Sequence, residues 1–126
     1  RLLAEAHTVV YHGLPKYTFY RHPGNNSAWT TDHSLLTPET LQEYLDAYRT
    51  RTQWLSEKFP NSAEAFQYFE WSFMISMVEK IERLGLEECR EIGTKLKIDL
   101  EAHRDNFLAC PEILPFEIDI VQKYIF

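Results

Sequence analysis

Helix-breaking residues divide the rear two thirds of this 126-residue chain at regular intervals. Proline stands at Pro38, Pro60, Pro111 and Pro115, and Gly85 lies between them. Proline is tolerated in the first turn of a helix but not in its interior, and glycine is the usual left-handed residue that follows a helix. The longer intervening segments carry apolar residues at helical spacing over about 20 residues. These breaks therefore predict helices that pack as antiparallel neighbours.

The signals at the segment ends set the expected helix bounds. Thr37 is an N-cap residue, Pro38 suits the first helical position, and Glu39 complements the positive end of the helix dipole. Asn61 or Ser62 caps the second helix. We expect four helices, which span residues 37–59, 61–85, 86–108 and 116–126.

The helical spacing also predicts which side chains form the core. On the second helix we expect the core face to be Phe66, Phe69, Phe73, Met77, Ile81 and Leu84. Tyr68 and Trp71 then point elsewhere, at about 100° per residue, and Trp71 belongs to an interaction surface if it is exposed. On the third helix one face carries Cys89, Ile92, Leu96, Leu100, His103 and Phe107.

The front of the chain is different in character. Residues 8–12 and 16–21 are rich in β-forming side chains, and Gly13 and Pro15 between them favour a turn. Residues 1–36 carry a net charge of +1, whereas the remainder carries −7. We therefore divide the chain into residues 1–36, with a short β-hairpin, and a helical region of residues 37–126. Because the chain opens on Arg1 with a sequence typical of the end of a helix, we expect it to be part of a longer protein.

Charge and cysteine content narrow the class of protein. The net charge of −6 argues against a nucleic-acid partner, which requires a basic surface to contact phosphates. No uncharged run reaches the roughly 18 residues that a transmembrane helix requires. Cys89 and Cys110 are too few for a disulfide framework and lack zinc-site spacing. Reduced thiols in a cytoplasmic protein are the simplest interpretation.

The histidines are the first candidates for chemistry. His7, His12 and His22 lie close together in sequence and could hold a metal ion, but the simpler interpretation is that His7 and His12 flank a half-buried strand. His103, on the apolar face of the third helix, is expected to be a core or boundary residue. The carboxylate pairs are typical of solvated helix faces, and the two cysteines are typical of packing.

The front of the chain resembles the end of the catalytic domain of family 2 glycosyltransferases, which have the GT-A fold. The similar segments are residues 2–11, 14–21 and 23–27, which give a helix end, a strand, an aromatic strand that ends in arginine, and a Gly-Asn-Ser loop. The residues that match in kind and order are Tyr17, Tyr20, Arg21, His22, Asn26 and Ser27. The resemblance covers about a quarter of the chain, and the helical region carries no family motif.

The resemblance implies a nucleotide-sugar-dependent enzyme with a divalent metal, Mg²⁺ or Mn²⁺, at the donor diphosphate. It implies that His22 is a metal ligand and that Arg21 contacts the diphosphate, since guanidinium groups pair bidentately with phosphates. A strand-end arginine paired with a carboxylate is the alternative for Arg21. No Asp-x-Asp motif and no Glu-Asp base pair of the family occurs in the chain, so we assign no catalytic residue.

The expected function is that of the C-terminal fragment of a glycosyltransferase. The intact enzyme would transfer a sugar to a glycan or lipid-linked acceptor, as in cell-surface polysaccharide synthesis, in the cytoplasm or at the inner face of the membrane. The fragment alone is expected to be inactive and mainly α, a bundle of three to four helices behind a hairpin remnant of the GT-A domain. We also expect a homodimer, because a strand pair removed from its sheet exposes its edges. The alternatives are a non-enzymatic helical protein–protein interaction module and a small metal-binding protein that uses His7, His12 and His22.

Overall fold

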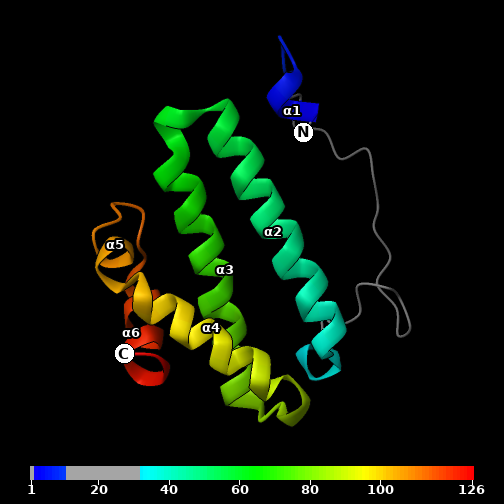
Figure 1. Cartoon of the computed structure of the whole chain (residues 1–126), viewed down its shortest axis with the longest axis vertical. Helices are drawn as coiled ribbons and strands as arrows, with labels where there is room; N and C mark the ends of the chain where they lie inside the picture. Colours follow the sequence, from blue (N-terminus) through cyan, green and yellow to red (C-terminus); the bar gives the residue numbers. More distant parts are fainter. Residues whose placement is uncertain (1, 11–31) are drawn as a thin grey trace.

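The structure is a computed structural model that describes residues 2–10 and 32–126, and these residues are mainly α-helical (Figure 1). The helices are α1 (Leu2–Glu5), α2 (Pro38–Lys58), α3 (Ala63–Leu84), α4 (Arg90–Ala102), α5 (Arg104–Leu108) and α6 (Pro115–Tyr124), with short 3₁₀ turns η2 (His33–Leu35), η3 (Pro60–Ser62) and η4 (Glu87–Cys89). The predicted mainly α fold is thus confirmed. Most of the predicted hairpin lies outside the described residues, and residues 8–10 of it are exposed and belong to no helix or strand.

The two long helices α2 and α3 form an antiparallel pair joined by η3 (Figure 1). Thr37 caps α2 as predicted, because its Oγ1 accepts a hydrogen bond of 3.2 Å from the Thr40 amide. The helix ends at Lys58, before Pro60, and the Phe59 amide donates to the Leu55 carbonyl at 2.8 Å. The end of α3 is also as predicted, with Gly85 in the left-handed conformation at a φ of 63°.

The predicted third helix is in fact broken at His103 into α4 and α5, although neither glycine nor proline stands at the break. In Figure 1, α4 crosses α3, and α6 lies behind α4 near the C-terminus. Both α4 and α6 pack on α3. Gly93 marks the close approach of α4 to α3, because a methyl group on its Cα would lie 3.3 Å from Ile81 Cδ1. The α3 helix is therefore the centre of the fold.

The central position of α3 corrects the predicted core face. The Phe69 side chain is 52% exposed, Leu84 is 37% exposed, and Phe66 and Phe73 are only partly buried. Tyr68 and Trp71, predicted to point elsewhere, are 3% and 6% exposed. A helix contacted by α2, α4 and α6 buries a wide face rather than a narrow stripe. The buried residues of α3 are Tyr68, Trp71, Met74, Ile75, Met77, Val78 and Ile81.

Side chains from the other helices complete this core. Leu41 and Leu45 of α2, together with Leu96 and Leu100 of α4, are almost fully buried. Phe107 of α5, on the predicted apolar face of the third helix, is also buried, as is Val121 of α6, whereas Phe116 is 57% exposed. Burying each of these large side chains stabilises the fold by roughly 1.5–3 kcal/mol relative to leaving it in water.

Candidate functional site

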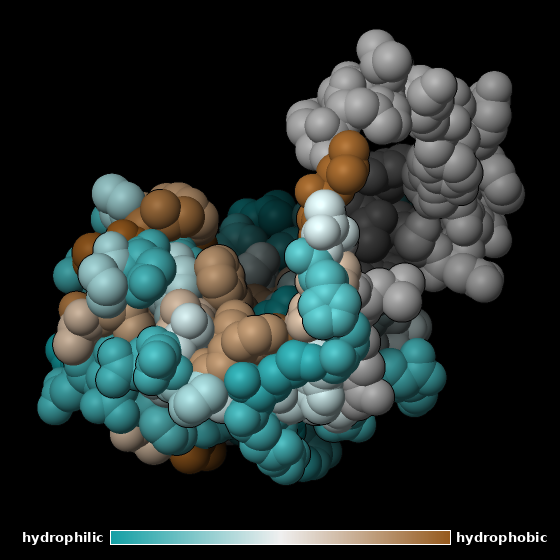
Figure 2. Space-filling view, turned by 90° about the horizontal axis from the view of Figure 1, so that it is seen from above, coloured by the Kyte–Doolittle hydropathy of each residue, from teal (hydrophilic) through white to brown (hydrophobic). Residues whose placement is uncertain are grey.

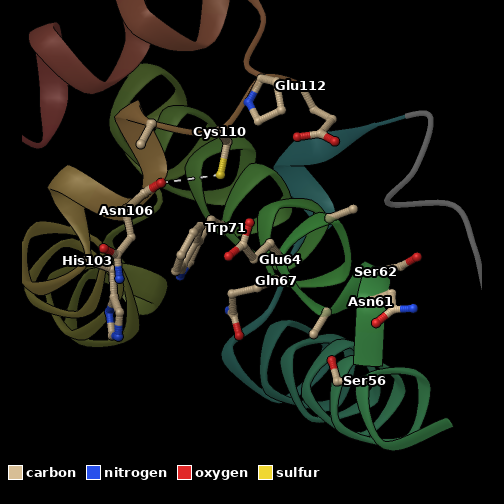
Figure 3. Close-up of a pocket in the computed structure, with 14 residues that line it drawn as sticks. Ser56, Asn61, Ser62, Glu64, Gln67, Trp71, His103, Asn106, Cys110 and Glu112 are labelled. Atoms are coloured by element: carbon tan, nitrogen blue, oxygen red, sulfur yellow. Dashed lines mark hydrogen bonds between the residues drawn. The ribbon is translucent and has the colours of Figure 1, made fainter. Parts of the chain in front are cut away.

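A half-open cleft of about 780 Å³ lies where the end of α2, η3 and the start of α3 face α5 and the loop before α6 (Figure 3). Its volume falls within the range of roughly 300–1,000 Å³ that is usual for small-molecule sites. Figure 2 shows the molecule from the end that carries η3, where apolar residues lie between hydrophilic residues on either side. The polar side chains that line the cleft include Ser56, Asn61, Glu64, Gln67, Asn106 and Glu112.

Trp71 and His103 form the wall between these polar groups. The centroids of their rings lie 5.6 Å apart, and Phe107 meets the Trp71 ring edge-on at 6.4 Å. Figure 3 shows the Trp71 ring between His103 and Asn106 on one side and Gln67 on the other. Within residues 2–10 and 32–126, no group accepts a hydrogen bond from the Trp71 indole nitrogen. Trp71 as a whole is only 6% exposed, but its indole nitrogen is open to solvent, so the cleft contains a donor that bonds to no described protein group.

The break between α4 and α5 places His103 at this wall. Its Nδ1 lies 2.8 Å from the Asp99 carbonyl oxygen, and a carbonyl oxygen only accepts hydrogen bonds. Nδ1 is therefore the donor, and in the neutral ring Nε2 is a free acceptor. The side chain is 45% exposed. Of the two alternatives expected for His103, a core residue or a boundary residue, the structure shows the boundary residue.

The electrostatic character of the cleft is acidic. Glu64 and Glu112 line it, and no lysine or arginine is among the described residues that do so. Burial raises the pKa of the Cys110 thiol in the wall, and the Glu112 and Glu64 carboxylates raise it further. The thiol donates to the Asn106 carbonyl at 3.3 Å. Cys110 is therefore protonated at neutral pH and acts as packing, as expected, rather than as a nucleophile.

A second polar cluster, which the sequence did not indicate, fixes α6 on α3. Glu117 is 1% exposed, and its carboxylate accepts hydrogen bonds from the Tyr68 hydroxyl at 2.7 Å, from the Ser72 hydroxyl and from the Leu114 amide at 2.9 Å. Burial and the neighbouring carboxylate raise the pKa of Tyr68 to about 12. The one signal in the sequence was the position of Glu117 in the first turn of α6, where a carboxylate can bond to the free amide groups of the helix start.

The residues predicted from the family resemblance are not among those that the structure describes. Arg21 and His22, the predicted diphosphate and metal contacts, lie outside the described residues, as does His12. His7 is exposed. No group of three or more His, Cys, Asp or Glu side chains in the described part of the chain is arranged to hold a metal ion. The cleft is therefore a candidate binding site that sequence reasoning missed, because it is assembled from two stretches that lie far apart in sequence, residues 56–71 and 103–112.

Comparisons with known proteins add no further identification. No protein-family profile, no curated protein and no solved structure matches the chain. Among the helices that the structure describes, none combines the length and apolar character needed to cross a bilayer.

Proposed function

We propose that the chain is the C-terminal part of a nucleotide-sugar-dependent glycosyltransferase of family 2, with its helical region on the acceptor side. The observation that carries the proposal is the ordered match of Tyr17, Tyr20, Arg21 and His22, followed by the Gly-Asn-Ser loop. In this proposal the intact enzyme transfers a sugar to a glycan or lipid-linked acceptor. Arg21 contacts the donor diphosphate and His22 is a ligand of Mg²⁺ or Mn²⁺, which neutralises the diphosphate charge when bound.

The charges of the cleft support the acceptor side rather than the donor side. A nucleotide diphosphate requires cationic or backbone amide partners. The cleft instead presents Glu64 and Glu112 without a lysine or arginine among its described lining residues. The helical region thus supplies a surface that repels the donor and suits a ligand without negative charge.

The donor chemistry is tested on the polypeptide encoded by the complete reading frame. The proposal expects a nucleotide-binding βαβ region with an Asp-x-Asp motif upstream of Arg1. It also expects release of a nucleoside diphosphate from a nucleotide sugar in the presence of Mn²⁺, and loss of that activity on His22→Ala. The 126-residue chain alone is the control and is expected to be inactive. A reading frame without such a region, or transfer by the 126-residue chain itself, would contradict the proposal.

Self-association belongs to the same proposal. Val9 and Val10, at 61% and 81% exposure, leave apolar surface uncovered at the front of the chain. We expect the 126-residue chain to form a two-fold dimer that covers this surface. Light scattering at micromolar concentration should give twice the monomer mass of 15.0 kDa, and a Val9→Lys, Val10→Lys variant should be monomeric. A monomeric mass for the unmodified chain would contradict the expectation.

One feature of the surface favours the alternative of a non-enzymatic interaction module. Phe69 is 52% exposed and borders a groove of about 280 Å³ with Tyr48 and Arg51. Tyr48 stacks on Phe73 with ring centroids 4.0 Å apart, and Arg51 lies 4.2 Å from the centroid of the Tyr48 ring. Exposed aromatic and arginine side chains are typical of protein interfaces. The reading-frame experiment above distinguishes this alternative, which expects no nucleotide-binding region.

A further inference from the structure

The hydrogen-bonding groups of the cleft limit the chemistry of its ligand. The Trp71 indole nitrogen only donates, and it has no acceptor among the described residues. The carboxylates of Glu64 and Glu112 only accept when ionised, whereas amide side chains such as Gln67 do both. Glu64 and Glu112 are exposed and the indole N–H is open to solvent, so water meets these groups in the empty cleft. A ligand that displaces this water without loss must accept from Trp71 and donate to the two carboxylates.

Each simple class of ligand can be compared with this requirement. An anion accepts hydrogen bonds but is repelled by Glu64 and Glu112, and no cation among the described lining residues offsets that repulsion. An ammonium group donates to the carboxylates but has no lone pair for Trp71. A hydroxyl group both donates and accepts. A neutral ligand with many hydroxyl groups is the class that meets both demands.

The shape of the cleft fits the same class. Its volume of about 780 Å³ exceeds what a single sugar ring fills. The exposed ring of His103 offers an apolar face, while Trp71, at 6% exposure, offers its N–H edge (Figure 3). We propose that this cleft binds a short neutral oligosaccharide, with Trp71 donating to a sugar hydroxyl and Glu64 and Glu112 accepting from others. Its assignment as the acceptor subsite rests on the proposed function, whereas the binding itself does not.

The Trp71 indole N–H is the direct probe of this site. Its signal in the ¹⁵N–¹H spectrum of the 126-residue chain is identified by its loss in Trp71→Phe. The ligands are maltotriose, cellotriose, mannotriose, galactotriose and tri-N-acetylchitotriose, at about 10 mM because a few neutral hydrogen bonds give dissociation constants near 1 mM. We expect at least one of them to shift this signal in a saturable way, and we expect spermidine and uridine diphosphate to leave it unchanged.

Variants test the named contacts. Trp71→Phe keeps the aromatic ring and removes the donor, so it should weaken saccharide binding about tenfold. Because this variant lacks the indole signal, its binding is followed through the backbone amide signals of the other residues that line the cleft. Glu64→Gln, at an exposed position that lines the cleft, is a second test that does not depend on a core substitution. The matched control is Glu88→Gln, which removes an exposed carboxylate that does not line the cleft. Thermal unfolding of every variant establishes that it is folded.

Specific outcomes would overturn the proposal. These are the absence of any saccharide-induced shift, a larger shift with spermidine or uridine diphosphate, or unchanged binding by both Trp71→Phe and Glu64→Gln. Failure of the proposed function has a different signature. Saccharide binding by the 126-residue chain, together with no sugar transfer by the complete polypeptide, would retain the binding site and reject the glycosyltransferase. Sugar transfer by the complete polypeptide, with no saccharide binding in the cleft, would retain the glycosyltransferase and reject the binding site.

Discussion

The Tyr68 hydroxyl donates a hydrogen bond of 2.7 Å to Glu117 Oε2 across the contact between α3 and α6. Both side chains are buried, at 3% and 1% exposure. A buried carboxylate is tolerated only when its acceptor capacity is filled, and here Ser72 and the Leu114 amide fill the rest. These hydrogen bonds to Glu117 hold α6 on α3. They thereby also position the loop before α6, which carries Glu112 at the cleft.

Removing the carboxylate should loosen α6. Glu117→Ala leaves the buried Tyr68 hydroxyl and the partly buried Ser72 hydroxyl and Leu114 amide without their acceptor. We expect the free energy of unfolding to fall by about 3 kcal/mol, as measured by urea denaturation. Asp119→Ala, at an exposed position of the same helix, is the control and should change it by less than about 0.5 kcal/mol. Equal effects of the two substitutions would contradict this account.

The burial of Tyr68, together with its hydrogen bond to Glu117, predicts a loss of stability in alkali. The pKa of Tyr68 is raised from 10.0 to about 12 in the folded chain, so the folded state holds its proton more tightly than the unfolded state. This stabilisation is complete below pH 10 and is lost as the pH rises toward 12. Over this range the unfolded state gives up the Tyr68 proton and is stabilised by ionising, whereas the folded state keeps the proton. We expect the unfolding free energy to fall by up to about 2 kcal/mol over this range.

Tyr68→Phe is the control for this pH dependence, since it removes the titrating group and keeps the ring. Urea denaturation at several pH values between 9 and about 12 should show a shallower decline for the variant than for the unmodified chain. Parallel declines in the two proteins would show that other groups cause the alkaline loss.

A third prediction concerns the close contact of α4 with α3. Gly93→Leu places a large side chain against Ile81, where even a methyl group would lie 3.3 Å from Cδ1. We expect a loss of about 3 kcal/mol in the free energy of unfolding from overpacking. Thr94→Leu at the exposed neighbouring position is the control. Adding Ile81→Ala to Gly93→Leu should recover part of the lost stability, because it makes room for the larger side chain at position 93. If the double variant is less stable than Gly93→Leu by the full cost of Ile81→Ala alone, the two positions are not in contact and the prediction is contradicted.

The ends of the helices could be predicted from the sequence because local chemistry decides them. Thr37 caps α2 and Gly85 ends α3 through interactions within a few residues. The core face of α3 could not be predicted, because it depends on which partners surround the helix. Tyr68 was expected to lie away from the core, and its burial becomes favourable only once Glu117, 49 residues away, accepts from its hydroxyl.

The cleft could not be predicted from the sequence for a related reason. Its wall depends on the break at His103, which has neither proline nor glycine, and on Trp71 lying beside it. Residues at the end of α2 and in the loop before α6 then complete the lining. No local pattern relates these segments, because only the packing of α3 against α2, α4 and α6 brings them together. The predicted contacts Arg21 and His22 remain predictions.

The most direct test of the account is steady-state sugar transfer by the polypeptide of the complete reading frame and its Trp71→Phe variant. The account predicts transfer from a nucleotide sugar to a neutral oligosaccharide. It further predicts that Trp71→Phe raises the KM for the acceptor about tenfold and leaves the KM for the donor unchanged, because the lost hydrogen bond is to the acceptor alone. No transfer from any nucleotide sugar, or a variant with an unchanged acceptor KM, would contradict the account.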